Sequence, residues 1–461
     1  MANFSRKLTA CSKRLKRGEK AEDRISELPH EVLVYILSLL PMEEAARTCI
    51  LSHRWRKVWT FVPVLNFDGS KTLYDYEKID LDHNEKKKIL DLEKHRYINW
   101  VNTVLKSYKG PAIEEFKVRF DLDLHFCCEI DRWIRFALDK KVKRLELDLK
   151  NYQGCRQQKC YQFPLLSNNY TMKRLRSRTL GFPSCKSLTA LILKEINVNG
   201  DVLQHFISSC KFLERLSIRG SNSLISLNFG SPIFLKYLEI IYCFNVRNLE
   251  LSACNLASFR YFGPRMSFPF EKFQNLVELS LGGSYCDYFI YKIRHFSAFL
   301  TQVNKLELHL LEIKEDMEFQ DWPVLSHLRQ LELIVDGNFD DNLLVFSPLI
   351  HASPNLYRLA LQVDWNEPSV KAKAMTVPES PHYQLKEVEM VGFMGLGADT
   401  EFITYLVKNA VMLEKITVDP REPDLLGSPW EYKDLKRIKA ARIHAERLRK
   451  RGFLEEKLVV L

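Results

Sequence analysis

One short motif, apolar-x-x-apolar-x-apolar, dominates the pattern of apolar and polar positions between residues 113 and 418. Its last two apolar positions are two residues apart, so in a strand both side chains point to the same face. Most copies start 20 to 29 residues after the preceding copy. The twelve copies begin at Ile113, Val142, Leu188, Leu213, Leu235, Leu256, Leu276, Val303, Leu328, Leu356, Leu385 and Leu413.

This spacing is typical of leucine-rich repeats, in which each coil contributes one strand and needs its neighbours to close a core. The pattern therefore predicts a curved α/β solenoid over residues 111–383. Extra copies at 224–229 and 246–251 predict further strands on the convex face. The interval of 46 residues after Val142 predicts an irregular coil or an insertion, for which the basic loop 173–178 is a candidate.

Residues 21–62 have a helical pattern in which Pro29 and Pro41 bracket the first helix. A second short helix is expected from Met42 to about Cys49, and a third after the N-cap Ser52. Apolar residues cover most of the first helix in two rows about 100° apart. The rows are Val32, Tyr35, Ile36 and Leu39, and Leu33, Leu37 and Leu40.

Three short helices cannot bury so many apolar side chains. Leaving five of them in water forgoes on the order of 10 kcal/mol. Either the first helix docks onto the rest of the chain or another protein covers it, and periodicity alone leaves both alternatives open.

The motifs of this segment resemble the F-box of the plant F-box/LRR family. They read DRISELP at 23–29, ILSLLP at 36–41, EAART at 44–48 and LSHRWRKVW at 51–59. The resemblance implies that this segment binds a Skp-type adaptor, and through it a cullin and a RING subunit. The adaptor-facing positions carried over are Leu28, Pro29, Leu33, Ile36, Leu37, Leu40 and Ala46. The positions expected to support the F-box core are Leu51, Trp55 and Trp59.

Residues 63–110 combine a polar stretch at 74–94 with a helical pattern at its end, and we expect a linker followed by a helix that caps the solenoid. The inward side of that helix is predicted from spacings of three and four. It comprises Tyr97, Val101, Val104, Leu105 and Tyr108.

Residues 384–420 resemble the FBD region found at the C-terminus of many plant F-box/LRR proteins. The resemblance implies a strand, a glycine turn, a helix and a second strand that end the solenoid. The inward residues of this helix are expected to be Phe402, Tyr405, Leu406 and Ala410. Residues 421–461 predict a basic amphipathic helix that either docks on the last coil or meets a partner, and docking is favoured. Its apolar positions are Leu435, Ile438, Ala441, Ala445 and Leu448.

The net charge of +10 resides in the two ends of the chain. Residues 1–20 carry +6 and residues 431–461 carry +5, so the body is nearly neutral. A nucleic-acid groove needs basic residues across the folded surface, which makes nucleic acid an improbable partner. We expect residues 1–20 to be a disordered basic arm, with a nuclear-import signal as the alternative.

The sequence gives no support for an enzyme. It has none of the Walker A, G-x-S-x-G, H-E-x-x-H or G-x-G-x-x-G motifs, and its twelve histidines are isolated. The eleven cysteines lack paired metal-ligand spacing, so we expect free thiols, no metal and no cofactor.

Two functions remain. The first is a non-catalytic substrate-recognition subunit of a Skp–cullin–F-box ubiquitin ligase, whose repeats bind a target protein. The alternative is a repeat scaffold that acts independently of ubiquitin. No apolar stretch is long enough to span a membrane and no secretory signal is present, so we expect a nuclear or cytoplasmic protein.

Overall fold

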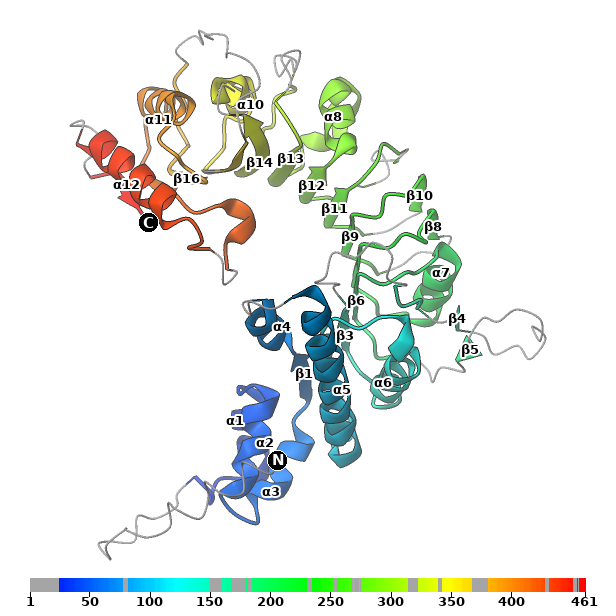
Figure 1. Ribbon diagram of the computed structural model, residues 1–461. Coiled ribbons are helices and arrows are strands. Elements are labelled where there is room, and N and C mark those ends of the chain that lie inside the picture. Colours follow the sequence, from blue (N-terminus) through cyan, green and yellow to red (C-terminus); the bar gives the residue numbers. More distant parts are fainter. Residues whose placement is uncertain are drawn as a thin grey trace, which may run out of the picture.

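The computed structural model describes residues 25–77, 82–149, 160–163, 165–166, 179–180, 185–229, 234–251, 255–266, 268, 273, 275–313, 322–338, 342–366, 380–427, 431–450, 454 and 456–461. Within these residues, fourteen parallel strands form one sheet that lines the inner side of an arc (Figure 1). The sheet strands are β1 (Val64–Asp68), β2 (Glu115–Arg119), β3 (Arg144–Asp148), β6 (Ala190–Lys194), β7 (Arg215–Arg219), β9 (Tyr237–Ile241), β11 (Ser258–Phe262), β12 (Glu278–Gly282), β13 (Lys305–Leu310), β14 (Gln330–Asn338), β15 (Arg358–Asn366), β16 (Glu387–Val391), β17 (Lys415–Asp419) and β18 (Leu458–Val460). The structure therefore confirms an α/β solenoid preceded by a helical unit.

All twelve predicted motif copies contribute to this sheet. In each copy the last two apolar residues lie in one strand and pair in register with their equivalents on the next, as Leu306, Leu331 and Leu359 do. These ladders of side chains are buried from β1 to β18. Because each strand buries its apolar side only against adjacent coils, the repeats form one continuous core.

Helices cover the outer side of the arc (Figure 1). They include α6 (Cys127–Asp139), α7 (Gly200–Ser209), α8 (Ser284–Tyr291), α10 (Ser347–His351) and α11 (Gly397–Asn409). The extra motif copies form β8 (Ser226–Phe229) and β10 (Asn248–Leu251), which pair in parallel and confirm the predicted second sheet. In the long interval after Val142, β4 (Leu165–Leu166) pairs with β5 (Thr179–Leu180), whereas the basic loop 173–178 lies outside the described residues.

The N-terminal helical unit comprises short helices that precede the sheet. They are α1 (His30–Ser38), α2 (Met42–Arg47), η1 (Thr48–Ile50), α3 (Trp55–Val58) and η2 (Trp59–Phe61). The expected basic arm at 1–20 lies outside the described residues.

The prediction that residues 63–110 begin with a linker is wrong. Strand β1 follows the helical unit at once and pairs with β2, so the solenoid starts one coil earlier than predicted. Val62, Leu65 and Phe67 repeat the motif spacing and are buried. Much of the polar stretch is helical, in α4 (Ser70–Glu77) and α5 (His83–Ser107). The predicted helix is present as α5 and all five predicted inward residues are buried, but it lies between β1 and β2 and therefore belongs to the first coil instead of capping it.

The C-terminal end of the solenoid matches its prediction closely. Phe402, Tyr405, Leu406 and Ala410 are buried on or directly after α11, and β16 and β17 flank that helix. The basic helix α12 (Leu435–Arg449) docks through Ile438, Ala441, Ala445 and Leu448, whereas Leu435 is exposed. The chain then adds β18, which the sequence pattern did not reveal, in parallel to β17.

Among the described helices, none has both the length and the apolar composition needed to cross a bilayer.

Candidate functional site: the exposed apolar face of the N-terminal helices

The N-terminal helices bury apolar side chains against one another. Leu33 and Leu37 of α1 are completely buried, together with Met42 and Ala45 of α2 and Val58 of α3. These residues belong to the same continuous apolar core as the solenoid. The orientation of α1 is therefore set by its Leu33/Leu37 row.

Polar contacts tie α3 to the segment that leads into α1. The indole Nε1 of Trp55 donates a hydrogen bond to Ser26 Oγ at 2.7 Å. The guanidinium of Arg54 donates hydrogen bonds to the backbone oxygens of Ser26 and Leu28. His30 and Phe61 pack edge to face with ring centroids 5.1 Å apart, which joins the two ends of the unit. Together these contacts hold α1 with one side inward and the other outward.

The outward side of α1 is strongly apolar. Val32, Tyr35 and Leu39 lie one or two turns apart, and Tyr35 and Leu39 are 65% and 67% exposed. Leu40 follows the helix, and Ile50 and Leu51 at the end of η1 are 73% and 64% exposed. We call this set of residues, Val32, Tyr35, Leu39, Leu40, Ile50 and Leu51, the exposed apolar face. Large exposed apolar surfaces on a folded protein are typical of protein interaction sites.

The structure divides the seven predicted adaptor-facing residues between the surface and the core. Leu40 and Pro29 are exposed, and Leu28, Ile36 and Ala46 are partly buried. Leu33 and Leu37 have no accessible surface, so their placement on a partner-facing surface is wrong. Whether the accessible members bind an adaptor remains a prediction.

The three predicted core residues also differ in their surroundings. Trp55 is buried and Trp59 is partly buried against the core, as expected. Leu51 is exposed, which corrects its assignment to the core, because the chain leaves η1 there with the side chain turned to solvent.

The exposed residues that the prediction did not select, Val32, Tyr35 and Leu39, form the other apolar row of α1. Helical spacing revealed both rows, but only the packing of α2 and α3 decides which row is inward.

The helical unit is joined directly to the first coil. The backbone N–H of Lys109 donates to Thr60 O at 2.8 Å, and that of Glu114 donates to Pro63 O at 2.8 Å. Because these bonds cross from the unit to the solenoid, no free linker separates the two parts.

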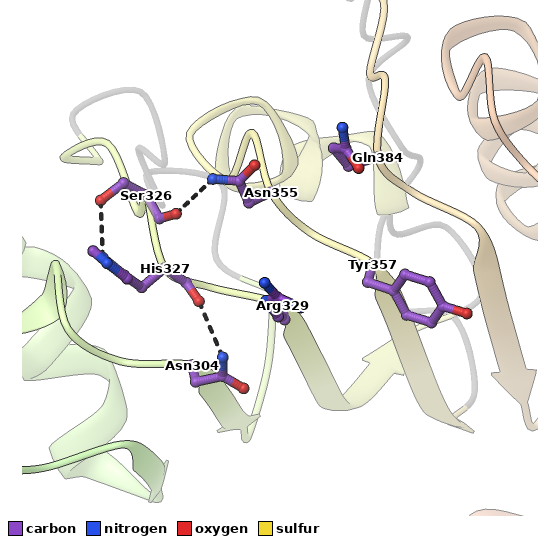
Figure 2. Close-up of a pocket in the computed structure, with 7 residues that line it drawn as sticks. All are labelled: Asn304, Ser326, His327, Arg329, Asn355, Tyr357 and Gln384. Carbon is purple, nitrogen blue, oxygen red and sulfur yellow. Dashed lines mark hydrogen bonds between the residues drawn. The ribbon is translucent and has the colours of Figure 1, made fainter.

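A second candidate is a hollow of about 720 Å³ at the amino-terminal ends of β13 to β16 (Figure 2). Its lining residues are all polar, and they are Asn304, Ser326, His327, Arg329, Asn355, Tyr357 and Gln384. Asn355 Nδ2 donates to Ser326 O at 2.7 Å, and Asn304 Nδ2 donates to His327 O at 3.4 Å. These amides join successive coils. Ser326 Oγ lies 3.2 Å from His327 Nδ1 (Figure 2), but the same nitrogen lies 2.6 Å from the backbone oxygen of Thr301. Because Nδ1 bonds that carbonyl only when it carries the proton, it is not placed as a base for the hydroxyl, and the lining offers hydrogen bonds rather than an evident reaction.

The concave face of the sheet carries charges that largely satisfy one another. Glu146 of β3 is buried, and Lys194 Nζ on the next strand lies 3.0 Å from its Oε1. Although burial by itself would raise the pKa of Glu146, the hydrogen bond and charge of Lys194 hold that pKa below its usual range. Such pairs stabilise the coil stacking and offer few free charges to a ligand.

Comparison with protein families decides what these parts are. A model described as At1g61320/AtMIF1, LRR domain, matches residues 104–449, and an F-box domain model matches residues 25–66. The first match spans well over half of the chain. The chain belongs to the plant F-box/LRR-repeat family. In this F-box/LRR-repeat protein the repeat match starts at residue 104, although the sheet already begins at β1.

Curated relatives from Arabidopsis thaliana support the same assignment. The F-box/FBD/LRR-repeat protein At4g26340 is 25% identical and covers 91% of this chain and 98% of the relative. The FBD-associated F-box protein At4g10400 is 26% identical, and the matched region covers 86% of this chain and 92% of that relative. The F-box/LRR-repeat protein At5g02700 is 30% identical over a shorter region, and the chain spans only 38% of that relative.

Proposed function

We propose that this F-box/LRR-repeat protein is the substrate-recognition subunit of a Skp–cullin–F-box ubiquitin ligase. The exposed apolar face docks on a Skp-type adaptor, and the repeats hold a target protein for ubiquitination. The protein itself supplies no reacting group and acts in the nucleus, the cytoplasm or both.

The observation that carries this proposal is the exposed apolar face itself. Six large apolar side chains at about 2 kcal/mol each represent on the order of 10 kcal/mol that burial by a partner could recover. Within the described residues, no part of the chain's own solenoid covers them. A partner surface therefore accounts for their exposure better than docking onto the chain.

The direct junction between helices and sheet suits this role. An adaptor bound to α1 and a target bound to the repeats would keep a defined separation, because hydrogen bonds join Thr60 and Pro63 to the first coil. A defined separation raises the effective concentration of a target lysine near the transferred ubiquitin.

The test is capture of the full-length chain by a purified Skp-type adaptor. The double variant Tyr35→Asp/Leu39→Asp places two charges on the exposed apolar face without disturbing the core. We expect it to weaken capture about 100-fold or more, since unpaired charges in a buried interface are strongly unfavourable.

A matched control is Phe212→Asp/Phe234→Asp, which changes two equally exposed apolar residues on the repeats. This variant should bind the adaptor like the unmodified chain. Equal capture of the unmodified chain and the Tyr35/Leu39 variant would contradict the proposal and favour a scaffold that acts without ubiquitin.

A further inference from the structure

Exposed aromatic rings gather at the carboxyl ends of β9 and β11, on the concave side of the sheet. Tyr242 directly follows β9 and has a positive φ of 56°. The centroid of its ring lies 4.7 Å from the centroid of the Phe262 ring. The ring centroid of Phe244 lies 6.2 Å from that of Tyr242. Tyr242 and Phe244 are 44% and 59% exposed, so their rings are accessible to a ligand.

Gly282 of β12 allows this arrangement. A Cβ atom at this position would lie 2.2 Å from Phe262 Cδ2, so the absence of a side chain leaves room for the ring. On the next strand, the His309 ring packs against Phe262 with centroids 5.0 Å apart. The rings thus come from β11, β13 and the end of β9, with Gly282 of β12 leaving the space between them.

Carboxylates follow these rings on the next two strands. Asp336 of β14 and Asp364 of β15 are register partners on the concave side of their strands. The nearest base to Asp336 is His309, whose Nε2 lies 3.9 Å from Asp336 Oδ1. Within the described residues, Asp364 makes no ion pair.

A third carboxylate, Asp424, comes from the segment after β17. The short helix η8 (Pro423–Leu425) contacts β15. Pro423 lies above the glycine turn, since a Cβ atom on Gly392 would be 3.3 Å from Pro423 Cδ. Asp424 also makes no ion pair within the described part of the chain. The set Tyr242, Phe244, Phe262, His309, Asp336, Asp364 and Asp424 is called the aromatic–acidic patch below.

The carboxylates of the patch influence one another and the tyrosine. Burial first, and then repulsion from Asp424 and Asp336, raise the pKa of Asp364, although the charge of Arg437 opposes this shift. Burial and the charges of Asp424 and Asp336 likewise raise the pKa of Tyr242. These effects indicate an excess of negative charge close to the rings.

The basic residues around the patch already have partners. Arg219 binds Glu239, Arg421 binds Asp419, and Arg437 lies 3.7 Å from Glu422. The patch therefore offers accessible rings beside carboxylates whose charge is only partly balanced, by His309 near Asp336 and by Arg437, whose charge acts on Asp364. Faces of aromatic rings and carboxylates both attract ammonium and guanidinium groups.

We propose that the aromatic–acidic patch binds a lysine- and arginine-rich segment of the target protein. This inference rests on the proposed function, in which the repeats hold a target, and it adds the chemical class of that target. Basic side chains would lie against the exposed rings of Tyr242 and Phe244 and pair with Asp336, Asp364 and Asp424. The same patch repels phosphate and acidic peptides.

The test measures binding of a fluorescent peptide of alternating lysine, arginine and glycine to the full-length chain by anisotropy, at about 0.15 M salt to suppress long-range attraction. We expect saturable binding of this peptide and none of a glutamate–glycine peptide. The variant Asp336→Asn/Asp364→Asn/Asp424→Asn should weaken binding about tenfold or more. Tyr242→Leu/Phe244→Leu, which keeps the charges, should weaken it about threefold.

The control variant Asp91→Asn/Asp139→Asn/Glu401→Gln removes three exposed acidic charges from α5, α6 and α11. It should bind the peptide like the unmodified chain. Equal losses in this control and in the patch variant would show attraction by net charge alone and overturn the proposal. Unchanged binding by the patch variant would also overturn it.

Two further measurements distinguish a target segment from the chain's own basic arm, and target binding from adaptor binding. Deletion of the basic residues 1–20 should leave peptide affinity unchanged. A tenfold gain would show that the chain's own arm occupies the patch, which would overturn the assignment to a target.

The peptide assay uses no adaptor, and the patch variant should still be captured by a Skp-type adaptor. Loss of peptide binding and loss of adaptor capture are therefore independent results.

Discussion

Two parallel hydrogen bonds join Arg219 of β7 to Glu239 of β9, from Nε to Oε1 at 2.7 Å and from Nη2 to Oε2 at 2.8 Å. Ser217 and Tyr237 donate to the same carboxylate, which is almost inaccessible to solvent. Burial by itself would raise the pKa of Glu239, but hydrogen bonds and the charge of Arg219 lower it to about 2. The carboxylate is thus held in its charged form between adjacent coils.

This carboxylate predicts an acid-sensitive solenoid. Because the folded pKa of Glu239 lies below its unfolded value, its contribution to the free energy of unfolding is present above about pH 4.5 and is lost as pH falls toward 2. The full contribution is up to about 3 kcal/mol. Urea unfolding followed by circular dichroism should show that Glu239→Gln costs most at pH 7 and little at pH 2.5. Glu214→Gln, at an exposed ion pair with Lys236, should have little effect at either pH.

Leu37 and Leu39 should respond oppositely to truncation, although they are two residues apart. Leu37→Ala leaves a cavity in the core of the helical unit and should lower the free energy of unfolding of that unit by about 2 to 5 kcal/mol. Leu39→Ala should change stability by less than about 0.5 kcal/mol, because its side chain is exposed. Hydrogen exchange of the α1 and α3 amides measures both effects. Equal protection in the two variants would contradict the orientation of α1 described above.

Asp399 should be essential for the turn that starts α11. Its Oδ2 accepts hydrogen bonds from the backbone N–H groups of Met394, Gly395 and Leu396, at 2.8 to 3.1 Å. Asp399→Ala leaves these donors without their acceptor and should destabilise the chain by about 2 to 4 kcal/mol. Asp399→Asn keeps one acceptor oxygen and should cost clearly less. Thermal unfolding of the two variants under the same conditions provides the comparison.

The end of the chain should be required for a monomeric solenoid. Deletion of residues 435–461 removes α12 and β18, and it exposes both the edge of β17 and the apolar surface under Ala441 and Ala445. Unprotected edges and uncapped coils promote association. Light scattering should detect oligomers of the truncated chain at micromolar concentration. Substitution of exposed Leu435 by Ser in the full-length chain should leave it monomeric.

The sequence predicted the repeats better than their boundaries. Leu306, Leu331 and their equivalents recur with regular spacing, because every coil must bury the same positions. Strand β1 escaped prediction since Val62, Leu65 and Phe67 form a single copy, separated from the next copy by the long helix α5. Strand β18 is short and follows a helix, so its pattern did not differ from that of a tail.

The candidate sites were only partly accessible to prediction for a different reason. The apolar rows of α1 are visible in the spacing, but Leu37 and Leu39 can be assigned to opposite sides only when α2 and α3 are in place. The aromatic–acidic patch depends on the register between coils. Tyr242 and Asp424 are 182 positions apart in the sequence, and no local pattern relates them.

The continuous connection from Trp59 through Pro63 into β1 has a consequence for how a ligase of this kind would select its lysines. A flexible hinge would let the bound target protein move widely relative to the transferred ubiquitin, so that many of its lysines could be modified. A rigid connection instead fixes the distance between the transferred ubiquitin and the target-binding surface of the repeats. Modification should therefore concentrate on the few target lysines that lie at that distance.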